Sequence, residues 1–189
     1  MNTLKFVRVG AIALIAAFSL CAASAATTLP IRVSIGGAGA GPFVADTSLP
    51  YLTETGADNI TTVPEDIDVS KAKDAAPKAV YQSVRWGTDM TFAFSGLKPK
   101  ANYSVRIHFA EVYYDSAGQR IFDVLINQKP VLTQFDILKD AGGKDIADVK
   151  TFDATADDSG KIVIETMTSK TGGVDYASIS GIEILETHK

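Results

Sequence analysis

The chain has 189 residues, of which 46% are hydrophobic and 21% are charged, a balance typical of a folded globular protein and not of a disordered one. Its 18 basic and 22 acidic residues give a formal net charge of -4, which argues against the dense basic face that nucleic-acid binding requires. The single cysteine cannot form a disulfide within the chain. One cysteine and two histidines are also too few for the usual structural zinc sites.

The first 25 residues have the pattern of a secretory signal peptide. Lys5 and Arg8 make the start basic, residues 10–22 are almost wholly apolar, and Ala23-Ser24-Ala25 is the small-x-small pattern that signal peptidase cleaves. The alternatives are an uncleaved N-terminal anchor and a lipoprotein attached through Cys21. We therefore predict a protein that is exported to the periplasm or secreted, with a signal peptide at residues 1–25.

Cleavage would change the totals of the working protein. It leaves 164 of the 189 residues, with 16 basic against 22 acidic groups, a formal charge of -6, and no cysteine. We predict that a single domain occupies residues 26–189 and is stabilised by its hydrophobic core alone. No further apolar run approaches the roughly 18 residues of a membrane-spanning helix, so no span is expected in the mature chain.

Short runs of alternating apolar and polar residues predict an all-β fold. The clearest run places Tyr103, Val105, Ile107 and Phe109 on one face of a strand. Further strands are predicted at residues 31–35, 90–94, 121–126, 131–137, 149–154, 162–167 and 179–185. About eight short strands separated by turn residues favour a β-sandwich or jelly roll.

One connection stands out by its length. Residues 43–76 lack a strong periodic pattern and contain Pro50 and Pro64. Structureless connections of this length are uncommon in compact domains and are often functional. We expect short strands within this stretch and one helical turn after Ser70.

The common catalytic arrangements are largely absent. The glycine-rich stretch at residues 36–41 lacks the GK[ST] ending of a phosphate-binding loop. A serine triad needs a histidine base, but His108 lies in the middle of a strand and His188 is the penultimate residue. We expect His108 to be a packed residue or one at the rim of a site, and we predict no catalytic residue.

Carboxylates are plentiful, so two other kinds of site stay open. A glycoside hydrolase needs a pair of them across a sugar. The candidates near strand ends are Glu111, Asp115, Asp136 and Asp175. Asp157 and Asp158 lie in a turn and could hold a structural calcium ion, although most acidic turns are only solvated.

Aromatic residues at strand ends suggest sugar binding. They are Tyr81, Trp86, Tyr113, Tyr114 and Tyr176. An aromatic face can stack on the C–H face of a sugar ring, while carboxylates and amides bind its hydroxyl groups. The alternative is that these rings cap the core and bind nothing.

Several segments, in the right order along nearly the whole mature chain, resemble the malectin domain, which is also classified as carbohydrate-binding module family 57. The most specific block is YSVRIHFAEVYY at residues 103–114, followed by GQRIFDV at 118–124. Weaker matches are IRVSIGG at residues 31–37, VYQSVRWG at 80–87 and ISGIEIL at 179–185.

The resemblance implies a galactose-binding-like β-sandwich that binds oligosaccharide, with glucose-type disaccharide units favoured, and has no catalysis of its own. By position it implies that Tyr113 and Tyr114 flank the sugar, that Tyr81 closes another side, and that Asp175 accepts hydrogen bonds from vicinal hydroxyls. Phe43 aligns loosely with a further family tyrosine, which would cost a hydroxyl and changes the expected preference.

Two further expectations accompany this site. Arg85 and Glu111 are expected either to orient the binding residues and tie strands together or to touch the sugar. Two stacked rings and a few charged hydrogen bonds, offset by the cost of association, predict a dissociation constant between about 1 μM and 1 mM. The alternatives are a glycoside hydrolase and an envelope module that binds protein, and a separate catalytic or envelope protein is a possible partner.

Overall fold

The computed structural model describes residues 27–57, 59–168 and 170–187. The predicted signal peptide and His188 lie outside these described residues. In chain order the elements are β1 (Ile31–Ser34), β2 (Gly39–Ala40), β3 (Phe43–Ala45), the 3-10 helix η1 (Asp46–Ser48), β4 (Leu52–Thr55), β5 (Asn59–Thr62), α1 (Lys78–Tyr81), β6 (Ser83–Gly87), β7 (Asp89–Phe94), β8 (Asn102–Ala110), β9 (Phe122–Ile126), β10 (Lys129–Phe135), α2 (Ile137–Ala141), β11 (Ala147–Thr155), β12 (Ile162–Met167), β13 (Ala177–Ile179) and β14 (Gly181–Glu186).

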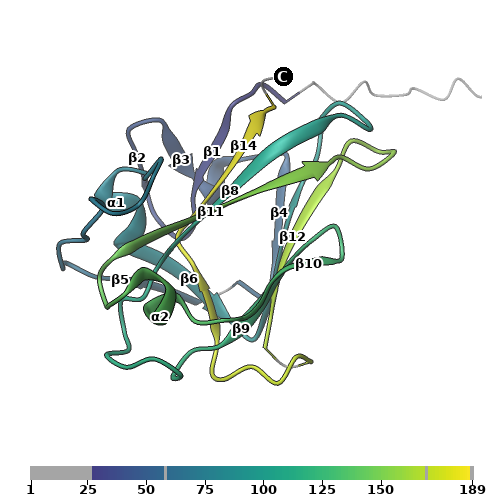
Figure 1. Cartoon of the computed structure of the whole chain (residues 1–189). Helices are drawn as coiled ribbons and strands as arrows, with labels where there is room; N and C mark the ends of the chain where they lie inside the picture. The colour runs from purple at the N-terminus through teal and green to yellow at the C-terminus, as the bar shows by residue number, and fades with distance from the viewer. Residues whose placement is uncertain (1–26, 58, 169, 188–189) are drawn as a thin grey trace, which may run out of the picture.

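Within the described residues these strands form three sheets. A six-stranded sheet has the order β11-β8-β14-β1-β3-β2, a five-stranded sheet the order β10-β9-β12-β7-β4, and a small sheet the order β13-β6-β5. The two large sheets face each other, with β8, β11 and β14 on one side and β4, β10 and β12 on the other (Figure 1). The predicted all-β sandwich is confirmed.

Strand alternation produces the main core between the large sheets. On β8 the side chains of Val105, Ile107 and Phe109 are fully buried and face the five-stranded sheet. Phe92 on β7 and Ile164 on β12 meet them from the other side. Each such side chain stabilises the fold by about 1.5–3 kcal/mol through removal from water, so a period of two in the sequence is enough to define this layer.

The outer face of the six-stranded sheet carries a second core. Phe43, Ile67, Val80, Tyr81 and Val84 gather in this smaller cluster. The stretch predicted as a long loop supplies Phe43, Ile67 and Ala76 to it, and in Figure 1 α1 lies on the side away from β4 and β12. Short strands are expected here, and β3, β4 and β5 are found, together with the 3-10 helix η1. The helical turn expected after Ser70 is wrong, because residues 71–76 form turns and no helix, and the short helix α1 begins only after Pro77.

Two predicted strand boundaries were wrong. The strand predicted at residues 131–137 runs from Lys129 to Phe135, because Asp136 ends it and caps α2 by accepting a hydrogen bond from the Lys139 amide at 3.1 Å. The strand predicted at residues 179–185 is divided at Ser180. Its first part, β13, pairs with β6, and its second part, β14, pairs with β1 and β8.

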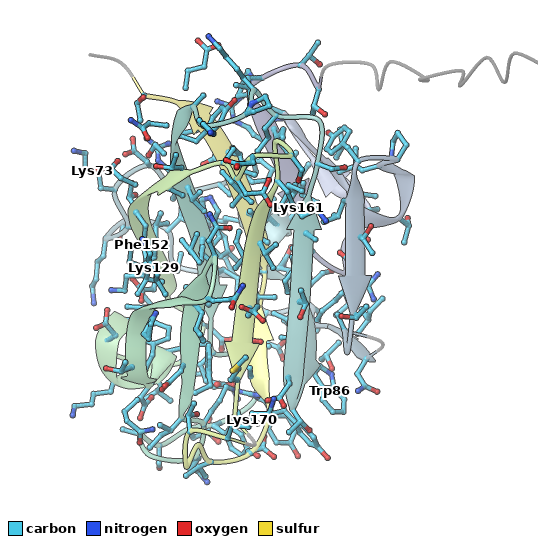
Figure 2. All side chains as sticks on the ribbon, turned by 90° about the vertical axis from the view of Figure 1, so that its right-hand side faces the viewer. Lys73, Trp86, Lys129, Phe152, Lys161 and Lys170 are labelled. Atoms are coloured by element: carbon cyan, nitrogen blue, oxygen red, sulfur yellow. The ribbon has the colours of Figure 1, made fainter. Side chains whose placement is uncertain are left out.

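The sandwich has two distinct ends. The start of β1 and the end of β14 lie together at the top of Figure 1. The connections that follow β8 and β12 run at the bottom, and Figure 2 labels Trp86 and Lys170 at this same end. Among the described residues no helix has the length and apolar character needed to cross a bilayer.

Candidate functional site: an aromatic pocket at one end of the sandwich

A pocket of about 260 Å³ opens at the end of the sandwich that carries the connections after β8 and β12. Three segments supply its walls, namely β5 with β6, the connection after β8, and the connection after β12. The lining residues are Thr61, Val84, Trp86, Val112, Tyr113, Tyr114, Arg120, Asp175 and Tyr176. Four of the nine are aromatic, so the walls are largely flat and apolar with a few polar groups, as in small-molecule sites generally.

Glu111 holds the connection after β8 in shape. One carboxylate oxygen accepts hydrogen bonds from the amides of Tyr113 at 2.9 Å and Tyr114 at 3.1 Å. The other accepts from Nε of Arg120 at 2.6 Å. Glu111 and Arg120 are both buried, so their charges must be paired to be tolerated. Glu111 therefore orients the two tyrosines, which matches the orienting role expected for it.

Arg120 connects this segment to the one after β12. Its Nη1 atom donates to the carbonyl of Tyr176 and lies 3.7 Å from a carboxylate oxygen of Asp175. Its guanidinium carbon lies 5.2 Å from the centre of the Tyr114 ring, a cation–π distance. The buried Arg120 side chain thus contacts Tyr114 on one wall of the pocket and Asp175 and Tyr176 on the other.

Asp175 presents its carboxylate to the pocket from a tight backbone turn. Its φ of +58° lies in the left-handed region, which aspartate occupies more readily than most residues. The preceding Val174 exchanges two backbone hydrogen bonds with Ile121, at 2.8 and 3.0 Å, which anchor the turn. The Asp175 side chain is 29% exposed, and a hydrogen bond to its carboxylate raises the pKa of the Tyr114 hydroxyl.

The aromatic rings lie in two pairs. Trp86 and Tyr176 are tilted with their ring centres 5.0 Å apart, while Tyr113 and Tyr114 meet edge to face at 4.9 Å. Trp86 is further fixed by its Nε1 donating to the Thr61 hydroxyl at 3.0 Å. The Tyr113 and Tyr176 side chains are the exposed members, at 68% and 42%. The pocket therefore offers rigid aromatic surface beside an accessible carboxylate.

Two of the predicted binding residues are not in this pocket. Tyr81 is fully buried on α1, where its hydroxyl accepts from the Ala76 amide at 3.0 Å and bonds Nδ1 of His108 at 2.9 Å. Burial raises the pKa of Tyr81 well above its usual value. Phe43 is 5% exposed and meets His108 edge to face at 5.4 Å. Neither residue is accessible to a sugar, and we correct both assignments to the second core.

His108 is the centre of this closed cluster. It is fully buried, and its Nε2 lies 3.1 Å from a carboxylate oxygen of Glu183. Burial alone would raise the pKa of Glu183, but hydrogen bonds from His108 and Arg32 outweigh it and hold that pKa below its usual value. The expectation that His108 is a packed residue is confirmed. Arg85, expected to tie strands together, pairs with the buried Asp46 at 2.6 Å.

Comparison with known proteins identifies the domain. The family model of the malectin domain matches residues 43–182. This chain belongs to the malectin domain family. The malectin domain is non-catalytic, which removes the glycoside hydrolase alternative.

Curated relatives are receptor-like proteins of Arabidopsis thaliana. Receptor-like protein 4 is 36% identical over 116 residues, which cover 58% of this chain and 18% of the relative. A probable receptor-like protein kinase is 28% identical over 178 residues, which cover 84% of this chain and 21% of the relative. The chain thus spans about a fifth of the length of these relatives.

Solved structures confirm the malectin-like fold. The ANX2 ectodomain from Arabidopsis thaliana matches with a TM-score of 0.71 at 23% identity, covering 82% of this chain and 48% of that one. A chain in the crystal structure of the plant peptide RALF23 in complex with FER and LLG2 matches with a TM-score of 0.67 at 18% identity. That match covers 82% of this chain and 47% of the other. At these identities the likeness shows the fold alone.

The other acidic candidates of this malectin domain have structural partners. Asp136 caps α2 and also accepts from the amide of Gly118 at 2.6 Å, while Asp115 is an exposed partner of Lys144. Asp157 accepts from the Ser159 and Lys161 amides and so shapes its own turn. Across residues 27–57, 59–168 and 170–187, no group of three or more His, Cys, Asp or Glu side chains comes together. Within these residues, no third side chain of this kind therefore joins Asp157 and Asp158 as a calcium ligand.

The family resemblance assigns a site role to only three of the nine lining residues, Tyr113, Tyr114 and Asp175. Trp86 and Tyr176 are among the aromatic residues whose position suggests sugar binding, while Arg120 enters only as part of the family block. A signal did exist for two of them, because Tyr176 adjoins Asp175 and Arg120 lies a few residues beyond the tyrosine pair. For Trp86 the pairing of β5 with β6 had to be known first.

Proposed function

We propose that this malectin domain is an exported module that binds oligosaccharide in the aromatic pocket, with glucose-type units favoured by the family. The single observation that carries the proposal is convergence. The family resemblance implies sugar contacts for Tyr113, Tyr114 and Asp175, and all three line one pocket together with Trp86 and Tyr176. Export of the protein, either to the periplasm or by secretion, belongs to the same proposal.

The pocket has the chemistry that a sugar needs. The rings of Trp86, Tyr113 and Tyr176 offer flat surfaces for C–H faces, each contributing about 0.5–1.5 kcal/mol beyond area burial. Asp175 can accept two hydroxyl groups, and each hydrogen bond to a charged group contributes about 1.5–3 kcal/mol. A volume of about 260 Å³ fits a small unit of a glycan and not a long segment. The dissociation constant expected from sequence, between about 1 μM and 1 mM, is kept.

A second candidate function is protein binding. Ile60 on β5 and Val174 beside Asp175 are exposed apolar residues, at 48% and 43%, and each adjoins a residue that lines the pocket. The structural match to a complex that contains the peptide RALF23 also directs attention to protein partners. A partner of this class would cover these two apolar side chains and would not need Asp175.

The test is a glycan array followed by calorimetry on the best ligand. Asp175→Asn should weaken binding about 10-fold or more, because it removes the charged acceptor, and Tyr114→Ala should weaken it severalfold. Asp158→Asn, at an exposed turn outside the pocket, is the matched control and should bind as the wild type does.

Two results would contradict the sugar proposal. One is a wild-type protein that binds no glycan on the array. The other is an Asp175→Asn variant that binds with unchanged affinity. Capture of an envelope protein that sugars do not displace would support the second candidate instead.

A further inference from the structure

The three charged side chains at the pocket, Glu111, Arg120 and Asp175, carry together one more negative than positive charge. Glu111 and Arg120 pair at 2.6 Å with side chains only 2% and 9% exposed, so these two charges cancel below the surface. Asp175 forms a longer ion pair with the same arginine, at 3.7 Å, and its side chain is 29% exposed. Among the described lining residues Arg120 and Asp175 are the charged ones. A ligand in the pocket therefore meets a carboxylate and no free cation.

The aromatic walls favour the same sign of charge in a ligand. A cation over the face of a tryptophan or tyrosine within about 6 Å of the ring centre is attracted by the ring quadrupole. The Arg120 guanidinium already uses this interaction on Tyr114 at 5.2 Å. Trp86, Tyr113 and Tyr176 add three further rings that line the same pocket. Aromatic faces around one carboxylate form a site suited to an ammonium group.

From this charge complementarity we propose that the pocket prefers glycans with a free, protonated amine, that is, oligosaccharides of glucosamine units over their neutral counterparts. The inference rests on the proposed function, since it assumes that the pocket takes a sugar. The ring of an amino sugar would use the aromatic walls as any sugar does. Its ammonium group would lie beside Asp175, gaining an ion pair and a cation–π contact that a hydroxyl cannot form. An acidic sugar would be disfavoured by the same carboxylate.

The experiment compares three oligomers of equal length and linkage, built from glucose, N-acetylglucosamine or glucosamine. Binding is measured by calorimetry at a pH where the amine is protonated. The glucosamine oligomer should bind about 5- to 30-fold more tightly than the glucose oligomer. The N-acetylated oligomer, which lacks the charge, should lose this advantage. Added salt should reduce the preference, because it screens the carboxylate.

Two variants locate the preference. Asp175→Asn should weaken every oligomer but should weaken the glucosamine oligomer most, so that the ratio falls to about one. Asp115→Asn removes an exposed carboxylate from the same connection outside the pocket, and it should leave the ratio unchanged. A ratio that persists in Asp175→Asn, or that falls equally in Asp115→Asn, would overturn the assignment to this pocket.

The remaining outcomes separate the inference from the function on which it rests. Equal affinity of the wild type for glucose and glucosamine oligomers overturns the amine preference and leaves sugar binding intact. Failure of all three oligomers to bind overturns both. Binding of a lysine-containing peptide, with none of the oligomers binding, overturns both and assigns the cationic site to a protein partner.

Discussion

A closed cluster around Tyr81 and the open pocket that contains Tyr113 and Tyr114 both lie near the end of β8. They differ mainly in their access to water. The closed cluster joins Tyr81, His108 and Glu183 behind the six-stranded sheet. The open pocket begins three residues after His108, where Glu111 and Arg120 hold two tyrosines in place. Each cluster combines tyrosine with a buried carboxylate that pairs with an arginine.

The difference lies in which atoms are already satisfied. In the closed cluster the Tyr81 hydroxyl and both ring nitrogens of His108 have protein partners, so nothing is left for a ligand. In the pocket only the supporting pair, Glu111 and Arg120, is buried and satisfied, while aromatic faces stay accessible. The same residue types therefore stabilise the fold in one place and form a candidate site in the other, and burial decides between the two roles.

The largest expected effect comes from breaking the closed cluster. Tyr81→Ala should lower the free energy of unfolding by about 3–5 kcal/mol, because it leaves a cavity in the second core. Tyr81→Phe keeps the ring and should cost about 1–3 kcal/mol, since the Ala76 amide and His108 Nδ1 lose their partner. Denaturant unfolding measures both variants. Sugar affinity per folded molecule should stay at the wild-type value, and a selective loss of affinity at unchanged stability would place Tyr81 in the binding site after all.

A smaller effect is expected where the two roles meet, at Glu111. Glu111→Gln should lower stability by about 2–3 kcal/mol, because Arg120 loses its buried charge partner while the amide oxygen still accepts hydrogen bonds. The two tyrosines should also be held less firmly, so affinity should fall along with stability. Unfolding and calorimetry on the same preparation test this. Glu186→Gln, an exposed glutamate at the far end of β14, is the control and should change neither.

Much of the fold could be predicted because it depends on local alternation. The period of two in β8 correctly divided its residues into a face toward the main core and an outer face. The role of the outer face could not be predicted in this way. His108 is buried because the stretch between β3 and β6 folds back over the sheet, a long-range contact that leaves no periodic trace in either segment.

The candidate site was predicted only in part for the same reason. Tyr113, Tyr114 and Asp175 follow the ends of strands, so their exposure could be anticipated from connection chemistry. Tyr81 also lies next to the end of a strand, just before β6. The folded-back stretch packs over Tyr81, however, and buries it. A position at the end of a strand therefore predicts access to solvent only where no other segment packs over that end.

The smallest effect should come from Tyr113, the most exposed ring of the pocket. At 68% exposure it contributes little to packing, so Tyr113→Ala should change the free energy of unfolding by less than about 0.5 kcal/mol. Loss of one aromatic contact should weaken sugar binding by about 2- to 12-fold. Val44→Ala removes an exposed apolar side chain on β3, away from the pocket, and should alter neither quantity. If Tyr113→Ala kept full affinity, the pocket would be reduced to Trp86, Tyr114 and Tyr176. If it lost stability instead, the distinction between an open and a closed tyrosine cluster would no longer hold.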